Sequence, residues 1–328
     1  MKRSAALLTV LLLTSVAGAG CSGDDGPSIV VYNAQHEQLL EEIAPLFTEE
    51  TGIEVELRNG SDPELAAQLI QEGDASPADV FLTENSPAMA AVEEAGLFAE
   101  LDPATTEAIP AQYRPTSGLW TGFVARSTVL VYNTDLVDEA DLPTSLLDLA
   151  DPAYAGRISF SPTGADFQAI VAAVLALEGE DATRDWLEGI AANGTVYDGN
   201  NVVLESVNAG ESDMGVIYHY YWYRDQAESG DVSDNTELHF FGNQDPGAFL
   251  SVSGAGVLAS SDSASDAEKF VAFLTSVEGQ QALADSYALE YPLNPEVQLA
   301  PPVKPFAELQ PPAVNVSDLD GATVVDLM

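Results

Sequence analysis

The stretch SIVVYNAQHEQLLEEIAPLFTEETGIEVELRNG, residues 28–60, determines the fold class of this chain. Residues 28–33 are apolar and β-branched enough to predict a buried strand. Residues 53–58, IEVELR, alternate apolar and polar side chains and predict a second strand. The segment between them predicts a helix that ends at Gly52, because apolar side chains recur at helical spacing: Leu39, Leu40, Ile43, Leu46 and Phe47. Strand, helix and strand in this order favour a parallel sheet covered by helices.

The same alternation continues to residue 96. Asp62 followed by Pro63 predicts the start of a helix that runs to about Gly73, since both residue types are favoured at helix amino ends. Its inner face is expected to carry Leu65, Leu69 and Ile70. A third strand is predicted over residues 79–83, and a further helix over residues 86–96.

Two long apolar strands divide the chain into two lobes. Residues 121–133 are expected to leave one lobe and enter the other, and residues 249–259 are expected to return the chain. A single helix is expected over residues 267–284, before prolines break the regular structure of the tail. The chain therefore predicts an α/β fold of two lobes, each a mixed, mostly parallel sheet with flanking helices, with the two crossover strands as the hinge. We expect one lobe to span 28–128 plus about 250–298, and the other to span 129–249 plus about 299–328.

The amino-terminal residues predict export from the cytoplasm. Lys2 and Arg3 precede an apolar run over residues 5–16, which is too short to span a bilayer comfortably. This pattern predicts a signal peptide over 1–20 and a linker over 21–27. Cys21 is the only cysteine, so it cannot form an internal disulfide, and it resembles the lipid-modified cysteine of bacterial lipoproteins. We expect a lipid anchor at Cys21 on the outer face of the cell membrane or in the periplasm; a plain cleaved signal is the alternative.

The chain is strongly acidic throughout. It has 53 acidic and 10 basic residues, for a formal net charge of −43. Nucleic acid is excluded as a natural partner, because too few cations are present to neutralise phosphates. The acidic residues are spread along the chain rather than gathered in one tail, which resembles adaptation to high salt. A cation-storage role is the rival explanation, but no calcium-loop pattern occurs in the sequence.

Aromatic side chains crowd into GVIYHYYWYRD, residues 215–225. Residues 214–217 predict a buried strand, so the aromatic residues are expected where that strand ends and a helix begins. Such strand ends are where open α/β sheets place their binding sites. The stretch is either an aromatic core or a metal site built on the paired phenolates of Tyr220 and Tyr221.

Two further residues complete a candidate metal site. His36 follows the first predicted strand and Glu84 follows the third, so both lie at the carboxyl ends of parallel strands. With Tyr220 and Tyr221 they suit a hard trivalent cation, since one carboxylate and two phenolates would neutralise Fe³⁺. Four protein ligands would leave two octahedral positions for water or an anion. A free tyrosine has a pKa of about 10, so only a highly charged metal would deprotonate both at neutral pH.

The chain resembles the bacterial ferric-ion-binding proteins of iron ABC importers, which have a transferrin-like, type II periplasmic-binding-protein fold. The similar motifs are YNAQH (32–36), SPADVFLTEN (76–85), HYYWY (219–223), DPGAF (245–249) and EYPLNP (290–295). The resemblance implies His36, Glu84, Tyr220 and Tyr221 as the metal ligands. It also implies a synergistic anion, namely carbonate, phosphate or citrate, bound by Thr163, Gly164, Ala165 and Asn200.

Two more residues are candidates for supporting roles in this site. Tyr218 stands where relatives often carry an asparagine that contacts the anion, and this difference argues against phosphate as the bound anion. The Tyr218 side chain is either a packing residue or a further phenolate near the metal. Arg126 lies on the first crossover strand and faces either the cleft or an ion-pair partner in the hinge.

These observations predict a monomeric, extracytoplasmic receptor that captures Fe³⁺ between its lobes and delivers it to an ABC permease and its ATPase. A binding protein of the same fold for an oxyanion, polyamine or sugar is the first alternative, since fold does not settle ligand. A secreted hydrolase is the second, but no GxSxG or HExxH motif occurs in the chain. We therefore expect no enzymatic activity.

The net charge of −43 predicts a folded state that gains stability from salt. The Debye length falls from about 10 Å at 0.1 M to about 3 Å at 1 M, so repulsion between surface carboxylates is screened. The midpoint of thermal unfolding should rise by several degrees between these potassium chloride concentrations. Sucrose, which screens no charge, serves as the control, and a midpoint that does not rise with salt would contradict the salt-adaptation hypothesis.

Overall fold

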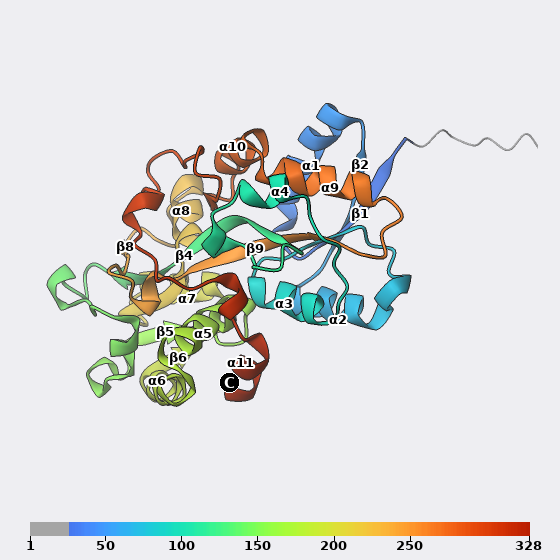
Figure 1. The fold of residues 1–328 in the computed structure, drawn as a ribbon. Coiled ribbons are helices and arrows are strands. Elements are labelled where there is room, and N and C mark those ends of the chain that lie inside the picture. Colours follow the sequence, from blue (N-terminus) through green and yellow to red (C-terminus); the bar gives the residue numbers. More distant parts are fainter. Residues whose placement is uncertain (1–25) are drawn as a thin grey trace, which may run out of the picture.

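The computed structural model describes residues 26–328, whose strands form one curled mixed sheet flanked by helices on both faces (Figure 1). The predicted signal peptide, the lipidation site Cys21 and residues 21–25 of the linker lie outside the described residues. The strand order is β2 (Glu54–Asn59), β1 (Ser28–Asn33), β3 (Val80–Leu82), β9 (Leu250–Val257), β4 (Thr121–Asn133), β7 (Met214–Tyr218), β5 (Ile158–Phe160) and β6 (Gly194–Val196). Two further strands, β8 (Thr236–His239) and β10 (Tyr291–Pro292), also pair with β4.

The amino-terminal third builds one end of the sheet. Its elements are β1 (Ser28–Asn33), α1 (Glu37–Thr51), β2 (Glu54–Asn59), α2 (Asp62–Glu72), β3 (Val80–Leu82), α3 (Ser86–Glu94) and α4 (Pro103–Glu107). Strand β1 pairs in parallel with both β2 and β3, as the alternation of strands and helices predicts. In Figure 1, α1 lies on one face of these strands while α2 and α3 lie on the other.

Strand β4 (Thr121–Asn133) connects the two ends of the sheet. Its thirteen residues are all buried, and they form the crossover strand that the sequence predicts. Residues 121–127 pair antiparallel with β9 (Leu250–Val257), whereas residues 128–133 pair with β7 and β8. The elements on the β9 side of this change are called the first lobe below, and the elements on the β7 side are called the second lobe.

The second lobe repeats the parallel plan of the first. Its elements are β5 (Ile158–Phe160), α5 (Ala165–Glu178), α6 (Glu180–Asn193), β6 (Gly194–Val196), α7 (Asn200–Asn208), β7 (Met214–Tyr218), α8 (His219–Glu228) and β8 (Thr236–His239). Strand β5 is parallel to both β6 and β7, and the antiparallel pairs of this lobe are those of β4 with β7 and β8. The strand end and helix start predicted within the aromatic stretch are confirmed, because β7 ends at Tyr218 and α8 begins at His219.

The segment after β9 contains two helices where the sequence pattern predicts one. They are α9 (Ala264–Thr275) and α10 (Val277–Asp285), which are followed by the short strand β10 (Tyr291–Pro292). The prediction of a single helix over 267–284 is wrong, because Ser276 has extended backbone and its hydroxyl accepts a hydrogen bond from the Gly279 amide at 3.0 Å. The spacing of apolar residues continues through Ser276, so hydrophobic periodicity does not reveal the break between the two helices.

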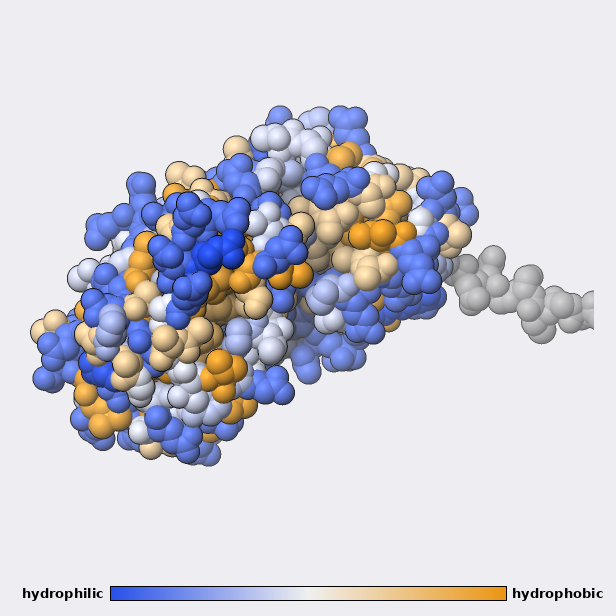
Figure 2. Space-filling model, turned by 90° about the horizontal axis from the view of Figure 1, so that it is seen from below, coloured by the Kyte–Doolittle hydropathy of each residue, from blue (hydrophilic) through white to orange (hydrophobic). Residues whose placement is uncertain are grey.

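Two apolar side chains that fit helical spacing lie on the surface. Ile70 of α2, which was expected on the inner face, is 47% exposed, and Leu46 of α1 is 44% exposed. Each stands at the edge of an apolar stripe whose centre is fully buried, as Leu39 and Leu69 are. Figure 2 shows that hydrophilic residues cover most of one face of the molecule, with apolar residues scattered among them. No helix within residues 26–328 is long and apolar enough to cross a membrane.

The tail packs against both lobes and ends in a helix that the sequence pattern does not predict, α11 (Gly321–Leu327). The Asn315 amide donates to the Ala111 carbonyl of the first lobe at 2.8 Å. Leu319 and Val324 join the apolar core of the second lobe. At Gly321 an added Cβ would lie 2.9 Å from Pro87 of α3, so the end of the tail also touches the first lobe. In Figure 1, α11 lies beside α5 and below α3.

Replacement of Gly279 by alanine should destabilise the fold. A Cβ at this position would lie 1.9 Å from the Phe273 carbonyl oxygen, which belongs to a helix backbone that cannot easily move. Overpacking of this kind costs about 1–3 kcal/mol, which urea unfolding would detect. Gly242→Ala is the matched control, because its nearest neighbour is the flexible end of Gln310 at 3.3 Å. Equal stability of the two variants would show that the junction of α9 and α10 is less tightly packed than described.

Candidate metal centre

The ends of three strands bring the predicted ligands together. His36 follows β1 and caps α1, and Glu84 lies between β3 and α3. Because β1 and β3 are parallel neighbours, both residues lie at the same edge of the first lobe. Tyr220 and Tyr221 lie in the first turn of α8, directly after β7 of the second lobe. The site therefore takes side chains from both lobes.

Short distances join the four predicted ligands. The Tyr220 hydroxyl donates to Glu84 Oε1 at 3.3 Å, and His36 Nε2 lies 3.7 Å from the same oxygen. The His36 and Tyr220 rings meet edge to face at 5.1 Å, and the Tyr220 and Tyr221 rings are stacked at 4.2 Å. Tyr220 is fully buried, while the side chains of His36 and Glu84 are about one-fifth exposed (18% and 21%).

Asp166 is a functional candidate that the sequence reasoning missed. It is the second residue of α5, and its Oδ2 accepts hydrogen bonds from the Tyr221 hydroxyl at 3.1 Å and the Asn200 amide at 2.8 Å. Its Oδ1 lies 3.4 Å from the Asn85 amide of the first lobe. The signal for it in the sequence is an acidic residue directly after the Thr163–Ala165 loop.

A buried ion pair lies beside these residues. Arg126 of β4 is fully buried, and its NH1 group donates to Glu290 Oε2 at 3.1 Å. Glu290 was not singled out from the sequence, although it lies in the EYPLNP motif. Its other oxygen, Oε1, lies 3.4 Å from His36 Nε2, and within residues 26–328 neither of these two atoms has a hydrogen-bond partner. Arg126 therefore holds the hinge ion pair that was one of its two predicted roles.

Tyr218 has a structural partner in the second lobe. It is fully buried at the end of β7, and its hydroxyl donates to the backbone carbonyl of Asp166 at 3.0 Å. The Arg126 guanidinium lies 5.7 Å from the centre of its ring. This packing role agrees with the first of the two roles that the sequence left open for Tyr218.

The predicted anion-binding residues surround the amino end of α5. Gly164 caps this helix without a side-chain hydrogen bond, and an added Cβ there would meet open space. Ala165 begins the helix, and Thr163 lies exposed in the preceding loop. Asn200 opens α7, and its amide is directed to Asp166. The free amides of a helix amino end favour an anion, and the Asp166 side chain lies at this end.

Burial controls the proton affinity of the site. Desolvation raises the pKa of the Glu84 and Asp166 carboxyls to about 7, although Arg126 opposes this change. Burial also raises the pKa of Tyr220 and Tyr221 well above the ordinary value, and lowers the pKa of His36. In contrast, the carboxylates of Glu290 and Glu84 outweigh desolvation and raise the pKa of Arg126. Arg126 therefore stays charged, while burial shifts Glu84 and Asp166 toward their protonated forms.

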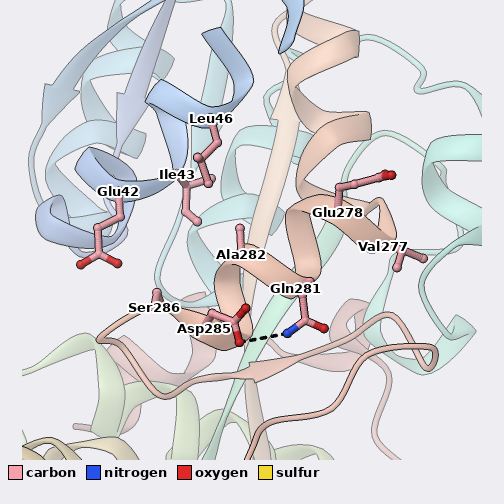
Figure 3. Close-up of a pocket in the computed structure, with 9 residues that line it drawn as sticks. All are labelled: Glu42, Ile43, Leu46, Val277, Glu278, Gln281, Ala282, Asp285 and Ser286. Carbon is pink, nitrogen blue, oxygen red and sulfur yellow. Dashed lines mark hydrogen bonds between the residues drawn. The ribbon is translucent and has the colours of Figure 1, made fainter. Parts of the chain in front are cut away.

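A surface pocket of about 670 Å³ lies elsewhere, between α1 and α10 (Figure 3). It is lined by Ile43, Leu46 and Ala282 together with the acidic side chains of Glu42 and Asp285. None of the predicted ligands lines it. The metal-site residues instead meet across the contact between the two lobes.

A family model described as "Bacterial extracellular solute-binding protein" matches residues 75–315. The chain belongs to this family of bacterial extracellular solute-binding proteins. One relative is the Fe(3+)-binding periplasmic protein of Serratia marcescens, which is 50% identical over 98% of this chain and 95% of its own length. Such relatives are solute-binding transport proteins rather than enzymes.

Two solved structures confirm the predicted type II periplasmic-binding-protein fold. Iron-bound HitA from Pseudomonas aeruginosa matches with a TM-score of 0.87 and 44% identity, over 92% of this chain and 98% of that chain. Trichodesmium IdiA (FutA), solved with iron and citrate ligands, matches with a TM-score of 0.82 and 28% identity, over 92% of this chain and 98% of that chain.

The metal-free protein should lose stability as the pH rises from about 5 to about 8. The Glu84 and Asp166 pKa values are about 7 in the folded state, above those of unfolded carboxyls, so the folded state binds more protons between these values. Their stabilising contribution is complete below the unfolded pKa and is lost as the pH rises through the folded pKa. Urea unfolding in the presence of a chelator would measure this loss.

Asp166→Asn should reduce that pH-dependent loss by about 1 kcal/mol or more, because the amide does not titrate. Asp231→Asn, at an exposed position, is the control and should leave the pH dependence unchanged. If both variants show the same dependence on pH as the unaltered chain, burial at Asp166 does not shift its titration.

Proposed function

We propose that this protein binds Fe³⁺ between its lobes, with His36, Glu84, Tyr220 and Tyr221 as ligands, and serves an iron importer. The observation that carries the proposal is the convergence of two adjacent phenols on a histidine and a glutamate from the opposite lobe. Within the described residues, no cluster of three histidine, cysteine or carboxylate side chains is placed to hold a metal by itself. The tyrosines are therefore essential to the donor set.

The chemistry of the donor set favours a trivalent cation. Burial raises the pKa of both tyrosines, so a weakly charged ion would not displace their protons. Phenolate and carboxylate oxygens are hard donors, and imidazole also suits iron. Relatives that carry the names of ferric-iron-binding proteins support the same ligand. This donor set favours iron over a metal-free oxyanion, polyamine or sugar as the ligand.

We further propose that Asp166 supplies an oxygen to the metal. Its Oδ2 accepts a hydrogen bond from the Tyr221 hydroxyl at 3.1 Å. If a metal replaced the hydroxyl proton, the Tyr221 oxygen and Asp166 Oδ2 would both bind the same ion. With Glu84 and two phenolates, Asp166 raises the ligand charge to −4, beyond that of Fe³⁺. Thr163, Gly164, Ala165 and Asn200 would then bind a small synergistic anion or water beside the amino end of α5.

Closure follows from where the ligands lie. We propose that the lobes, with boundaries near residues 128 and 250, move about the paired strands β4 and β9. Metal bound by both lobes stabilises the closed form, because only that form brings all ligands together. An ABC permease and its ATPase would then receive iron from the monomeric protein. We place the protein outside the cytoplasm, anchored through a lipid on Cys21.

Titration of the metal-free protein with ferric citrate at high salt tests this function. A visible tyrosinate-to-iron absorption band should saturate at about one iron per chain. The double variant Tyr220→Phe/Tyr221→Phe should lose the band, because both phenolates are removed. Tyr154→Phe/Tyr197→Phe is the matched control, since these two partly exposed tyrosines lie outside the site. Absence of a band in the unaltered protein would overturn the proposal, and so would a band that persists in the site variant.

A further inference from the structure

Asn85 connects the candidate metal site to both lobes and to both crossover strands. It is 2% exposed and lies between Glu84 and the start of α3. Its Oδ1 accepts from the Ser251 hydroxyl at 2.7 Å and lies 3.4 Å from the Arg126 NH2 group. Arg126 and Ser251 are directly paired across β4 and β9. The amide oxygen therefore contacts the two strands about which the lobes are expected to move.

The amide nitrogen of Asn85 contacts two carboxylates, one in each lobe. Nδ2 lies 3.2 Å from Asp62 Oδ2 in α2 and 3.4 Å from Asp166 Oδ1 in α5. The backbone amides of Glu84 and Asn85 also donate to Asp62, each at 2.8 Å, so the loop that carries Glu84 is fixed within its own lobe. The contact with Asp166 is the one that crosses to the other lobe.

The chemistry of the carboxamide explains why this residue type suits the position. An asparagine has two N–H donors and one acceptor oxygen, and here the donors face two carboxylates while the oxygen faces an arginine and a serine. An aspartate of the same shape would have no donors and would add a third carboxylate. The contact with Asp166 also uses Oδ1, which leaves Oδ2 directed to Tyr221 and Asn200.

We propose that Asn85 is a positioning residue that orients the Asp166 carboxylate toward the metal and couples this orientation to the hinge. Oδ1 of Asp166 is held by Asn85, so Asp166 presents Oδ2 to the iron. When the lobes separate, this contact breaks together with the ligand set, because Asn85 stays with the first lobe. The proposal rests on the proposed iron-binding function and adds to it the residue that directs one ligand.

The test compares iron release from Asn85→Leu and Asn85→Ser. Leucine keeps the approximate size of the side chain but removes every hydrogen bond of the amide. Serine keeps an oxygen near Ser251 but is too short to reach Asp166. Release of iron to an excess chelator should be about tenfold faster in both variants, since a lost hydrogen bond to a charged group has this effect. The tyrosinate-to-iron band should shift toward that of Asp166→Ala.

A double-mutant comparison separates positioning from general damage. In the Asp166→Ala background, Asn85→Leu should accelerate release no further, because the group through which Asn85 acts is already absent. Asn235→Ala, at an exposed position away from the site, should release iron at the rate of the unaltered protein. Thermal unfolding identifies a variant that fails to fold, and Asn85→Ser then provides the comparison.

Each outcome decides between the hypotheses. Unchanged release and an unchanged band in both Asn85 variants would overturn the positioning role. The same acceleration with and without Asp166 would also overturn it, since Asn85 would then act by another route. Failure of the unaltered protein to bind iron would overturn the proposed function itself, and this result is obtained before any variant is compared.

Discussion

A single buried cation, the guanidinium of Arg126, holds together the region where the two lobes meet. It is fully buried on β4, pairs with Glu290 and approaches serine side chains on β9. The carboxyls of Glu84 and Asp166 lie close enough for Arg126 to oppose the rise of their pKa values. Without this charge, the carboxyl groups of Glu84, Asp166 and Glu290 would share one desolvated volume in which the described residues provide no other fully buried arginine or lysine.

The guanidinium of Arg126, with that of Arg224 over the Tyr220 ring at 5.8 Å, does not outweigh the effect of burial on the acidic groups, and this imbalance gives the site its chemistry. Burial raises the proton affinity of Glu84, Asp166 and both adjacent tyrosines, so the metal-free site retains protons. A trivalent cation would replace these protons and supply the missing positive charge. Binding is therefore linked to proton release, and the same linkage weakens binding in acid.

The arrangement of the sheet explains how distant residues reach one site. Each of these residues follows the carboxyl end of a strand. His36 and Glu84 follow strands of the first lobe, and Tyr220 follows a strand of the second lobe. Strand β4 belongs to both lobes, so the proposed closure would change its twist and move one set of the proposed ligands relative to the other. The tail also packs against both lobes and so forms a further link between them.

The sequence by itself determined the alternation of strands and helices, the crossover strand over residues 121–133 and the position of the aromatic residues at a strand end. These features depend on local periodicity, which a chain displays directly. It did not reveal the break at Ser276, the exposure of Leu46 or the terminal helix α11, since each depends on what packs nearby. Family resemblance named His36, Glu84, Tyr220 and Tyr221 as ligands, and the structure shows that these residues converge. Only the tertiary structure placed Asp166, Asn85 and Glu290 around them, because contacts between residues far apart in the chain follow from the folding of the sheet and leave no local pattern.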